Sequence, residues 1–207
     1  AVKISGVLVN TKNVDVLQKV FLTFIILIED IMKQKMPLLG ISGYSGCGKT
    51  TLLEKLLPHL NRLGLRVSVI KHSHHNAHVD KEGKDSWRMK EAGSKQVIMA
   101  CDNRWALMTE TSSPTDLYYL SEQFDSTLTD LVLVEGFKHE PIPKILLHRR
   151  EMTKSLPEID PNVVALATNY FIKTDRTLLD LNNIDEIAQF VYRWFTRHKR
   201  EYYEPRR

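Results

Sequence analysis

Short apolar runs alternate with amphipathic stretches through most of this chain. The apolar runs have the length of single strands and the composition of buried parallel strands, and they lie at residues 37–42, 66–70, 131–134, 144–147 and 163–167. Residues 51–63 carry leucines at the spacing of one buried helical face, and Asn183 with Glu186 predicts the capped start of a last helix. Strands that alternate with helices indicate a three-layer α/β domain with a mostly parallel central sheet.

Two further patterns lie between the second and the third of these runs. Residues 96–100 and 104–109 have the composition of strands and flank a short polar turn, which predicts a β-hairpin beside the main sheet. A short helix is expected at residues 85–92. A second is expected from Pro114, with Ser113 as its cap, to about residue 124.

The first 35 residues differ from the rest of the chain. Residues 14–32 have apolar side chains at helical spacing, but the fully apolar part, 20–28, is shorter than the ~20 residues that span a bilayer. Acidic residues follow it where a signal peptide needs small ones. We expect residues 1–35 to be an extension and Met36 to be the natural start; an amphipathic helix that packs or meets a partner is the alternative. The domain is expected at 36–200, with a basic tail at 201–207.

The stretch from Gly43 to Thr50, between an expected strand and an expected helix, has the Walker A or P-loop pattern: a glycine, four variable residues and Gly-Lys-Thr. Glycines let backbone N–H groups converge on an anion, and the helix N-terminus adds its positive dipole. Lys49 is expected to reach the β- and γ-phosphates, and the Thr50 hydroxyl to ligate Mg²⁺. The residues expected to hold a nucleotide are Gly43, Ser45, Gly46, Cys47, Gly48, Lys49, Thr50 and Thr51. The sequence therefore predicts a nucleotide-binding protein.

Composition adds little to this picture. The net charge of +4 over 207 residues is too mild to indicate a nucleic-acid ligand, and no membrane partner is expected. Two cysteines give no disulfide framework and suit a reducing cytoplasm. Cys47 occupies a variable P-loop position, where it is interpreted as a small residue rather than a redox switch.

A P-loop needs an acidic partner at the end of a nearby buried strand, the Walker B position. Glu135 follows the apolar run 131–134, and Gly136 allows the backbone to pass close to the γ-phosphate. Asp130, at the other end of the run, is about 16 Å away along the strand and too far to share the site. We therefore expect Glu135 on the metal or water side of the site.

Residues 71–80 combine Lys71, four histidines and Asp80. We rank a switch-type loop first, with Lys71 and the histidines near phosphate and Asp80 near Mg²⁺. A plain polar surface loop ranks second, and a structural metal site at His72, His74, His75 and His78 third. The expected catalytic residues are Lys49, Asp80 and Glu135. The expected metal ligands are Thr50, Asp80 and Glu135.

Five blocks together resemble the MobB family, the molybdopterin-guanine dinucleotide biosynthesis adaptor proteins. The blocks lie at residues 43–51, 71–75, 80–86, 104–110 and 134–140. The resemblance runs in unbroken order from Met36 to about residue 196, and residues 1–35 have no counterpart in it. It implies the P-loop NTPase fold and a GTP-binding protein with weak GTPase activity.

The resemblance also implies Mg²⁺, a homodimer and a partner, the guanylyltransferase that attaches GMP to molybdopterin; molybdopterin is a further ligand to consider. Guanine preference rests on the resemblance, because the Asn-Lys-x-Asp run of common GTPases is absent. Asn169 is the expected base contact, with Asp175 as the other option. Arg104 and Lys138 are weaker candidates for phosphate or partner contacts.

Two other functions stay open at this point. One is a P-loop kinase for a small hydroxylated metabolite, which should carry an arginine-bearing lid that Arg149-Arg150 only imitates. The other is a metal-delivery GTPase, suggested by the clustered histidines. No residue stands out as a glutamine-type water positioner or an arginine finger, which predicts slow turnover unless a partner completes the site.

Overall fold

The computed structural model describes residues 2–4, 7–9, 36–73 and 80–203. Its centre is a six-stranded sheet in the order β10-β9-β8-β3-β7-β4, in which every neighbouring pair is parallel. The strands are β3 (Leu38–Ser42), β4 (Val67–Lys71), β7 (Leu131–Glu135), β8 (Lys144–His148), β9 (Val163–Thr168) and β10 (Thr177–Asp180). The parallel α/β fold expected from the alternating pattern is confirmed.

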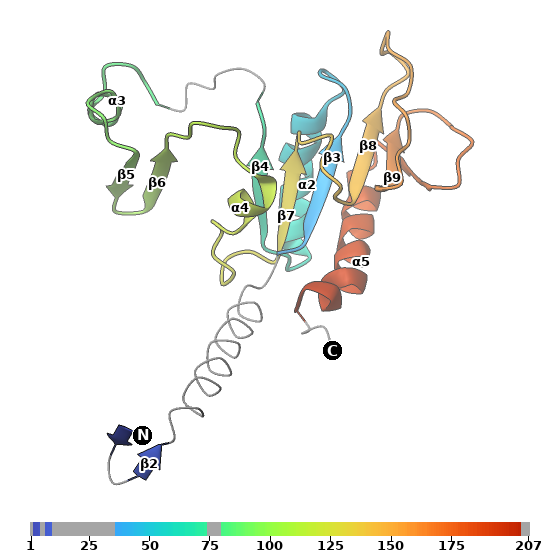
Figure 1. Ribbon diagram of the computed structural model, residues 1–207. Coiled ribbons are helices and arrows are strands. Elements are labelled where there is room, and N and C mark those ends of the chain that lie inside the picture. Colours follow the sequence, from blue (N-terminus) through green and yellow to red (C-terminus); the bar gives the residue numbers. More distant parts are fainter. Residues whose placement is uncertain (1, 5–6, 10–35, 74–79, 204–207) are drawn as a thin grey trace.

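Helices cover the two faces of this sheet unequally (Figure 1). The long helices α2 (Lys49–Arg62) and α5 (Ile184–Tyr203) pack on one face, where their apolar side chains meet Leu39 and Ile41 of β3. The opposite face, which carries Leu38 of β3, is covered by the short helix α4 (Leu117–Ser121) and by loops. Because side chains of a strand alternate between faces, each fully apolar strand supplies both cores.

Helix α2, which follows the loop after β3, is anchored in the core by its apolar face. Four leucines of this helix are buried, as their spacing predicted. The helix continues through Pro58 to Arg62, and Gly64 follows it with φ +79° and donates its N–H to Asn61 O at 2.9 Å. This is the glycine position that commonly closes a helix.

An arm of one helix and one hairpin lies beyond the β4 edge of the sheet (Figure 1). It consists of α3 (Asp85–Glu91) and the antiparallel strands β5 (Gln96–Cys101) and β6 (Arg104–Thr109). The predicted hairpin is confirmed with almost the expected bounds. It is a sheet of its own and does not extend the central one.

Two element boundaries and one strand differ from the sequence expectation. Helix α4 begins at Leu117, not at Pro114, because Asp116 is its cap: the Asp116 carboxylate accepts the N–H groups of Tyr118 and Tyr119. Helix α5 continues to Tyr203, so the first three residues of the segment expected as a tail, 201–203, belong to the helix. The edge strand β10 was not expected, because four residues between polar flanks give no clear period.

The N-terminal segment is described only in part. Strands β1 (Val2–Ile4) and β2 (Val7–Val9) pair antiparallel. The helix expected at 14–32 lies outside the described residues. Within the part of the chain that is described, no helix combines the length and the apolar character needed to cross a bilayer.

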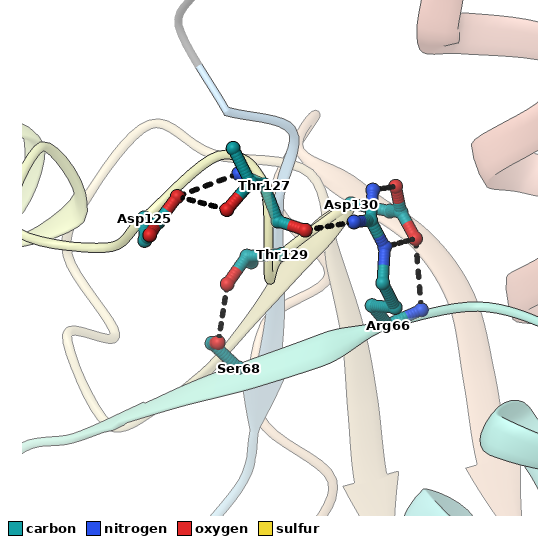
Figure 2. A network of polar contacts seen from close by, with 6 residues as sticks. All are labelled: Arg66, Ser68, Asp125, Thr127, Thr129 and Asp130. Atoms are coloured by element: carbon teal, nitrogen blue, oxygen red, sulfur yellow. Dashed lines mark hydrogen bonds and ion pairs between the residues drawn. The ribbon is translucent and has the colours of Figure 1, made fainter.

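A polar network joins the starts of β4 and β7 (Figure 2). The Asp130 carboxylate accepts hydrogen bonds from the Arg66 guanidinium and, at 2.9 Å, from the Arg66 backbone N–H, while Ser68 and Thr129 share a hydrogen bond of 2.7 Å. The Arg66 side chain, which also donates to Thr127 O, lowers the pKa of Asp130. Asp130 therefore stabilises the end of β7 opposite to Glu135, as its position along the strand predicted.

Candidate functional site

The P-loop has a backbone that only glycine permits at several points. Gly43, Gly46 and Gly48 have φ values of +140°, +81° and +95°. A Cβ on Gly43 would lie 2.6 Å from Leu147 O and 2.8 Å from Cys47 Sγ, so a side chain has neither the conformation nor the space. Gly48 is the N-cap residue, directly before the start of α2 at Lys49. The loop therefore wraps closely around the N-terminus of that helix.

Lys49 folds back over the loop. Its ammonium group donates to Gly43 O at 3.1 Å and to Tyr44 O at 2.9 Å, which holds the charge across the opening of the loop. Beneath it, Cys47 is fully buried, and this burial raises the pKa of the Cys47 thiol. A neutral, enclosed thiol agrees with the interpretation of Cys47 as a small packing residue.

Thr50, Glu135 and Lys71 form one polar group at the start of α2. Thr50 Oγ1 lies 3.0 Å and 3.1 Å from the two carboxylate oxygens of Glu135, and Lys71 Nζ donates to Thr50 Oγ1 at 3.2 Å and lies 3.6 Å from Glu135 Oε2. Glu135 is buried with only 8% of its surface exposed. Two oxygens bound to one Mg²⁺ at about 2.1 Å and at right angles lie about 3 Å apart. The spacing of the hydroxyl and the carboxylate therefore fits a magnesium ion.

The sheet register explains how Lys71 reaches this group. Strands β4 and β7 are parallel, and Lys71 stands opposite Glu135 in the ladder. One residue further along the chain, the backbone N–H of His72 donates to Glu135 O at 2.8 Å. Gly136 lies so close to His72 that a Cβ on Gly136 would be 2.7 Å from His72 Cβ. Gly136 also has φ +97°. The glycine after the strand is thus needed for the close approach of two strand ends.

A cavity of about 720 Å³, here called the front cavity, opens beside the P-loop. Its walls come from the P-loop, the segment after β7 and the loop between β8 and β9, and its floor includes Leu146 and Val163. Basic side chains at its rim include Lys138 and Lys154, the second with its ammonium 5.0 Å from the centre of the Tyr44 ring. The lining also includes Glu158 and Asp160, so the cavity joins the phosphate loop to a partly apolar surface with both basic and acidic side chains around it.

The structure does not bring Asp80 to this group. Asp80 Oδ1 accepts a hydrogen bond from the buried Ser86 at 2.9 Å, and Asp80 lines a small space between α3 and the hairpin with Val97 and Met108. Its assignment to Mg²⁺ stays an untested prediction that this placement does not support. His74, His75 and His78 lie outside the described residues, and the described part of the chain contains no cluster of three or more His, Cys, Asp or Glu side chains with metal-site geometry.

The remaining candidates fall in different places. Lys138 lines the front cavity, whereas Arg104 lies in β6 of the arm. Asp175 is exposed near Arg176, 4.0 Å away. The Asn169 side chain accepts the N–H of Arg150 and donates to the Glu151 carboxylate, so it is bonded to the loop that follows β8. Of the two residues expected to contact the base, Asn169 is thus bonded to the turn whose first residue, Arg149, contacts the P-loop.

Two side chains near the site were not expected there: Arg149 was noted in the sequence only as an imitation of a kinase lid, and Glu151 was not noted at all. Arg149 donates from Nε to Cys47 O at 3.2 Å, which ties the end of β8 to the P-loop. Glu151 receives both hydrogen bonds of the Asn169 amide. Neither belongs to a motif, and only the order β9-β8-β3 in the sheet makes them neighbours of the site.

A family model described as "Molybdopterin guanine dinucleotide synthesis protein B", MobB, matches residues 38–169, which contain the P-loop, Lys71, Glu135 and the arm. The chain belongs to the MobB family. The molybdopterin-guanine dinucleotide biosynthesis adapter protein of Haemophilus influenzae is 71% identical over 163 residues, 79% of this chain and 92% of that protein. The Escherichia coli adapter protein is 47% identical over 78% of this chain and 95% of its own length.

Solved MobB structures have the same fold. The crystal structure of Bacillus subtilis MobB covers 74% of this chain and 97% of its own with a TM-score of 0.60 at 25% identity. The crystal structure of a MobB homologue from Bacillus stearothermophilus matches 78% of this chain and 99% of its own chain, with a TM-score of 0.57 at 24% identity. The MobB resemblance and the P-loop α/β fold inferred from the five sequence blocks are confirmed.

Proposed function

We propose that this MobB-family protein binds GTP with Mg²⁺ at its P-loop and acts as an adaptor for the enzyme that attaches GMP to molybdopterin. The role in molybdopterin-guanine dinucleotide biosynthesis follows from family membership. The observation that supports the nucleotide and the metal is the contact between Thr50 and Glu135 at the mouth of the P-loop. A hydroxyl and a buried carboxylate directly after the P-loop lysine and at the end of a neighbouring strand are the two ligand types that hold Mg²⁺ in a nucleotide site.

Each group of the site has a defined part in binding. Phosphate oxygens would replace the carbonyls of Gly43 and Tyr44 as acceptors of the Lys49 ammonium. Backbone N–H groups of the loop and the N-terminus of α2 would hold the remaining phosphate charge. Thr50 and Glu135 would hold the metal, which neutralises the phosphates, and Lys71 would then turn from Glu135 to a phosphate oxygen.

We expect hydrolysis by the isolated protein to be slow. Catalysis of phosphoryl transfer to water usually needs a residue that orients the water and a cation that meets the developing charge. No glutamine lines the described walls of the front cavity. Arg149 is engaged with Cys47 O beneath the loop. The site thus supports nucleotide binding more strongly than turnover, which suits an adaptor.

The front cavity gives molybdopterin a place next to the nucleotide. The half-buried Tyr44, Phe137 and Pro157 supply an apolar surface for a ring system, and Lys138 with Lys154 supplies charge for a phosphate. Lys144 does not contribute charge to a ligand, because its buried ammonium donates to Lys138 O and Glu140 O and pairs with Asp160. A pterin phosphate in this cavity would lie beside the terminal phosphates of GTP.

The arm supports a homodimer. Ile98, Trp105 and Leu107 lie on one face of the hairpin and are 64%, 67% and 41% exposed, whereas Val97 and Met108 on the other face are half-buried beside α3. A two-stranded sheet with a bare apolar face is marginally stable by itself. A second copy of the arm would cover that face. Both cysteines are free thiols, which suits a protein that works in the cytoplasm.

The adaptor role is tested by reconstitution. Formation of molybdopterin-guanine dinucleotide by the purified guanylyltransferase from GTP and molybdopterin is followed with and without this protein, and with Lys49→Ala as a variant that lacks the phosphate contact. We expect the wild-type protein to raise the yield or the rate and Lys49→Ala to do so weakly. No effect of the wild-type protein at saturating concentration would contradict the proposal.

A further inference from the structure

The turn after β8, residues 149–151, is fastened to the P-loop. Arg149 Nε donates to Cys47 O at 3.2 Å, and a Cβ on Gly48 would lie only 3.5 Å from the same nitrogen. Gly48 is the last residue before α2. The turn therefore rests against the half of the phosphate loop that leads into the helix, whereas the front cavity adjoins the half that begins at Gly43.

The same turn is fastened to the end of β9. Asn169 Oδ1 accepts the backbone N–H of Arg150 at 2.9 Å, and Asn169 Nδ2 donates to the two carboxylate oxygens of Glu151 at 2.8 and 2.9 Å. A second link joins Tyr170 Oη to His148 Nδ1 at 2.6 Å. These bonds fix the Glu151 carboxylate at the sheet edge where β8 and β9 end.

Glu151 is suited to accept further hydrogen bonds. Its side chain is exposed, and a carboxylate has about four acceptor positions, of which the Asn169 amide uses a part. Its own backbone N–H and the Asn169 amide, with the charges of Arg149 and Arg150, lower the pKa of Glu151. The group is therefore an ionised acceptor at neutral pH.

The strands on the two sides of β3 indicate which way a bound nucleotide would point along the carboxyl ends of the strands. The metal group of Thr50, Glu135 and Lys71 lies on the side of β7 and β4. In a P-loop the lysine meets the β- and γ-phosphates and the chain continues over the start of the helix toward the α-phosphate. A nucleotide with its metal at β7 therefore carries its base toward β8 and β9, where Glu151 and Asn169 lie.

We propose that Glu151, positioned by Asn169, accepts hydrogen bonds from the N1–H and the exocyclic amino group of a guanine base. This inference rests on the proposed function, in which the ligand is GTP. Guanine presents two neighbouring N–H donors on that edge and a carboxylate accepts both, a charge-assisted pair of bonds. Adenine has the lone pair of its N1 at the same place, and a carboxylate, which is also an acceptor, would repel that lone pair.

In this proposal Asn169 has a positioning role, whereas a direct contact with the base was expected from the sequence. Its amide is bonded to the turn on both sides, so it orients Glu151 and does not itself face the base. The reader of guanine and the residue that holds it come from two loops that are 18 positions apart in the chain. This separation explains why no contiguous guanine motif is present.

The test is calorimetric titration with GTP, ITP and ATP, each with Mg²⁺, of the wild-type protein, Glu151→Gln and Asn169→Ala. ITP lacks the exocyclic amino group. We expect Glu151→Gln to lower GTP affinity at least tenfold and to leave ATP affinity unchanged or higher, so that the preference for GTP over both ITP and ATP disappears. Asn169→Ala should lower GTP affinity less, again without a loss for ATP. Glu122→Gln, an exposed glutamate beside α4, is the matched control with wild-type affinities.

The outcomes separate this inference from the function on which it rests. A wild-type protein that prefers GTP, with the same preference in Glu151→Gln, overturns the role of Glu151 and leaves the GTP site intact. An equal loss of GTP and ATP in Glu151→Gln also overturns it, because the residue then supports the phosphate loop and not the base. A wild-type protein without any preference for GTP contradicts the proposed function itself.

Discussion

Thr50 and Glu135, 85 positions apart in the chain, share hydrogen bonds of 3.0 and 3.1 Å at the mouth of the P-loop. The first is at the start of α2 and the second is the last residue of β7. Parallel pairing of β3 with β7 brings the two together. In the proposed function, this hydroxyl and this carboxylate hold the metal ion of the nucleotide.

The first prediction concerns Glu135. Glu135→Gln keeps the size of the side chain and removes the charge that Mg²⁺ requires, so GTP affinity in the presence of Mg²⁺ should fall by about tenfold or more. Affinity in EDTA should stay the same. The measurement is calorimetric titration in both conditions, with Glu122→Gln as the control. An equal loss with and without Mg²⁺ would show that Glu135 acts on the fold of the loop and not through the metal.

The second prediction concerns Gly136. Gly136→Ala combines a left-handed backbone, φ +97°, with a methyl group 2.7 Å from His72 Cβ. Gly64→Ala is the matched control, because its φ is +79° and nothing lies within 4 Å. Both lose about 1–2 kcal/mol of unfolding free energy to backbone strain, and Gly136→Ala should lose about 1–3 kcal/mol more to the steric clash. Urea denaturation measures both, and equal losses would contradict the close approach of β4 and β7.

The third prediction is a pH dependence. Hydrogen bonds from the Arg66 side chain lower the pKa of Asp130. A lowered pKa in the folded state means that the bonds stabilise the protein above the unfolded pKa of about 4 and are lost as the pH falls below it. Asp130→Asn should therefore cost about 1–2 kcal/mol at pH 7, and this cost should shrink toward pH 3.

The check is urea denaturation of the wild-type protein and Asp130→Asn at several pH values. Arg62→Ala, a change at the exposed end of α2, serves as the control that removes an arginine elsewhere. A stability difference between wild type and Asp130→Asn that stays constant from pH 7 to pH 3 would rule out the ion pair as the source of the pKa shift.

The fourth prediction concerns the arm. Trp105→Asp places a charge on the bare face of the hairpin, at its most exposed apolar side chain, and should turn the proposed dimer into a monomer. Leu128→Asp, at a position 69% exposed outside the arm, should leave the mass in solution unchanged. Sedimentation equilibrium gives the mass of each. A wild-type monomer, or a Trp105→Asp protein that is still a dimer, would contradict the assignment of this surface.

Much of the fold could be predicted from local patterns in the sequence. Fully apolar strands such as Leu131–Glu135 and the leucine face of α2 are set by burial on both sides of a parallel sheet, so the sequence alone carries them. The P-loop could also be predicted, because its glycines and Lys49 lie close together in one continuous stretch of the sequence. The hairpin was found because its two strands flank a short turn.

What could not be predicted depends on the order of the strands. The pairing of Lys71 with Glu135 needs the register of β4 and β7, and the bonds of Asn169 to Glu151 need β8 and β9 as neighbours. Asp80 was expected near Mg²⁺ as part of a switch-type loop, and in the structure it contacts Ser86 beside the arm. The role of Asp80 at the metal therefore stays an untested prediction, which the sequence alone could not decide.

The most direct test of the central claim is calorimetric titration of the wild-type protein and Lys49→Ala with GTP and with ATP in the presence of Mg²⁺. We predict that the wild-type protein binds GTP more tightly than ATP. Loss of the Lys49 ammonium should weaken GTP binding by about 1.5–3 kcal/mol, or about 10- to 150-fold. Equal or tighter binding of ATP, or a GTP affinity that Lys49→Ala leaves unchanged, would contradict a GTP site at this P-loop.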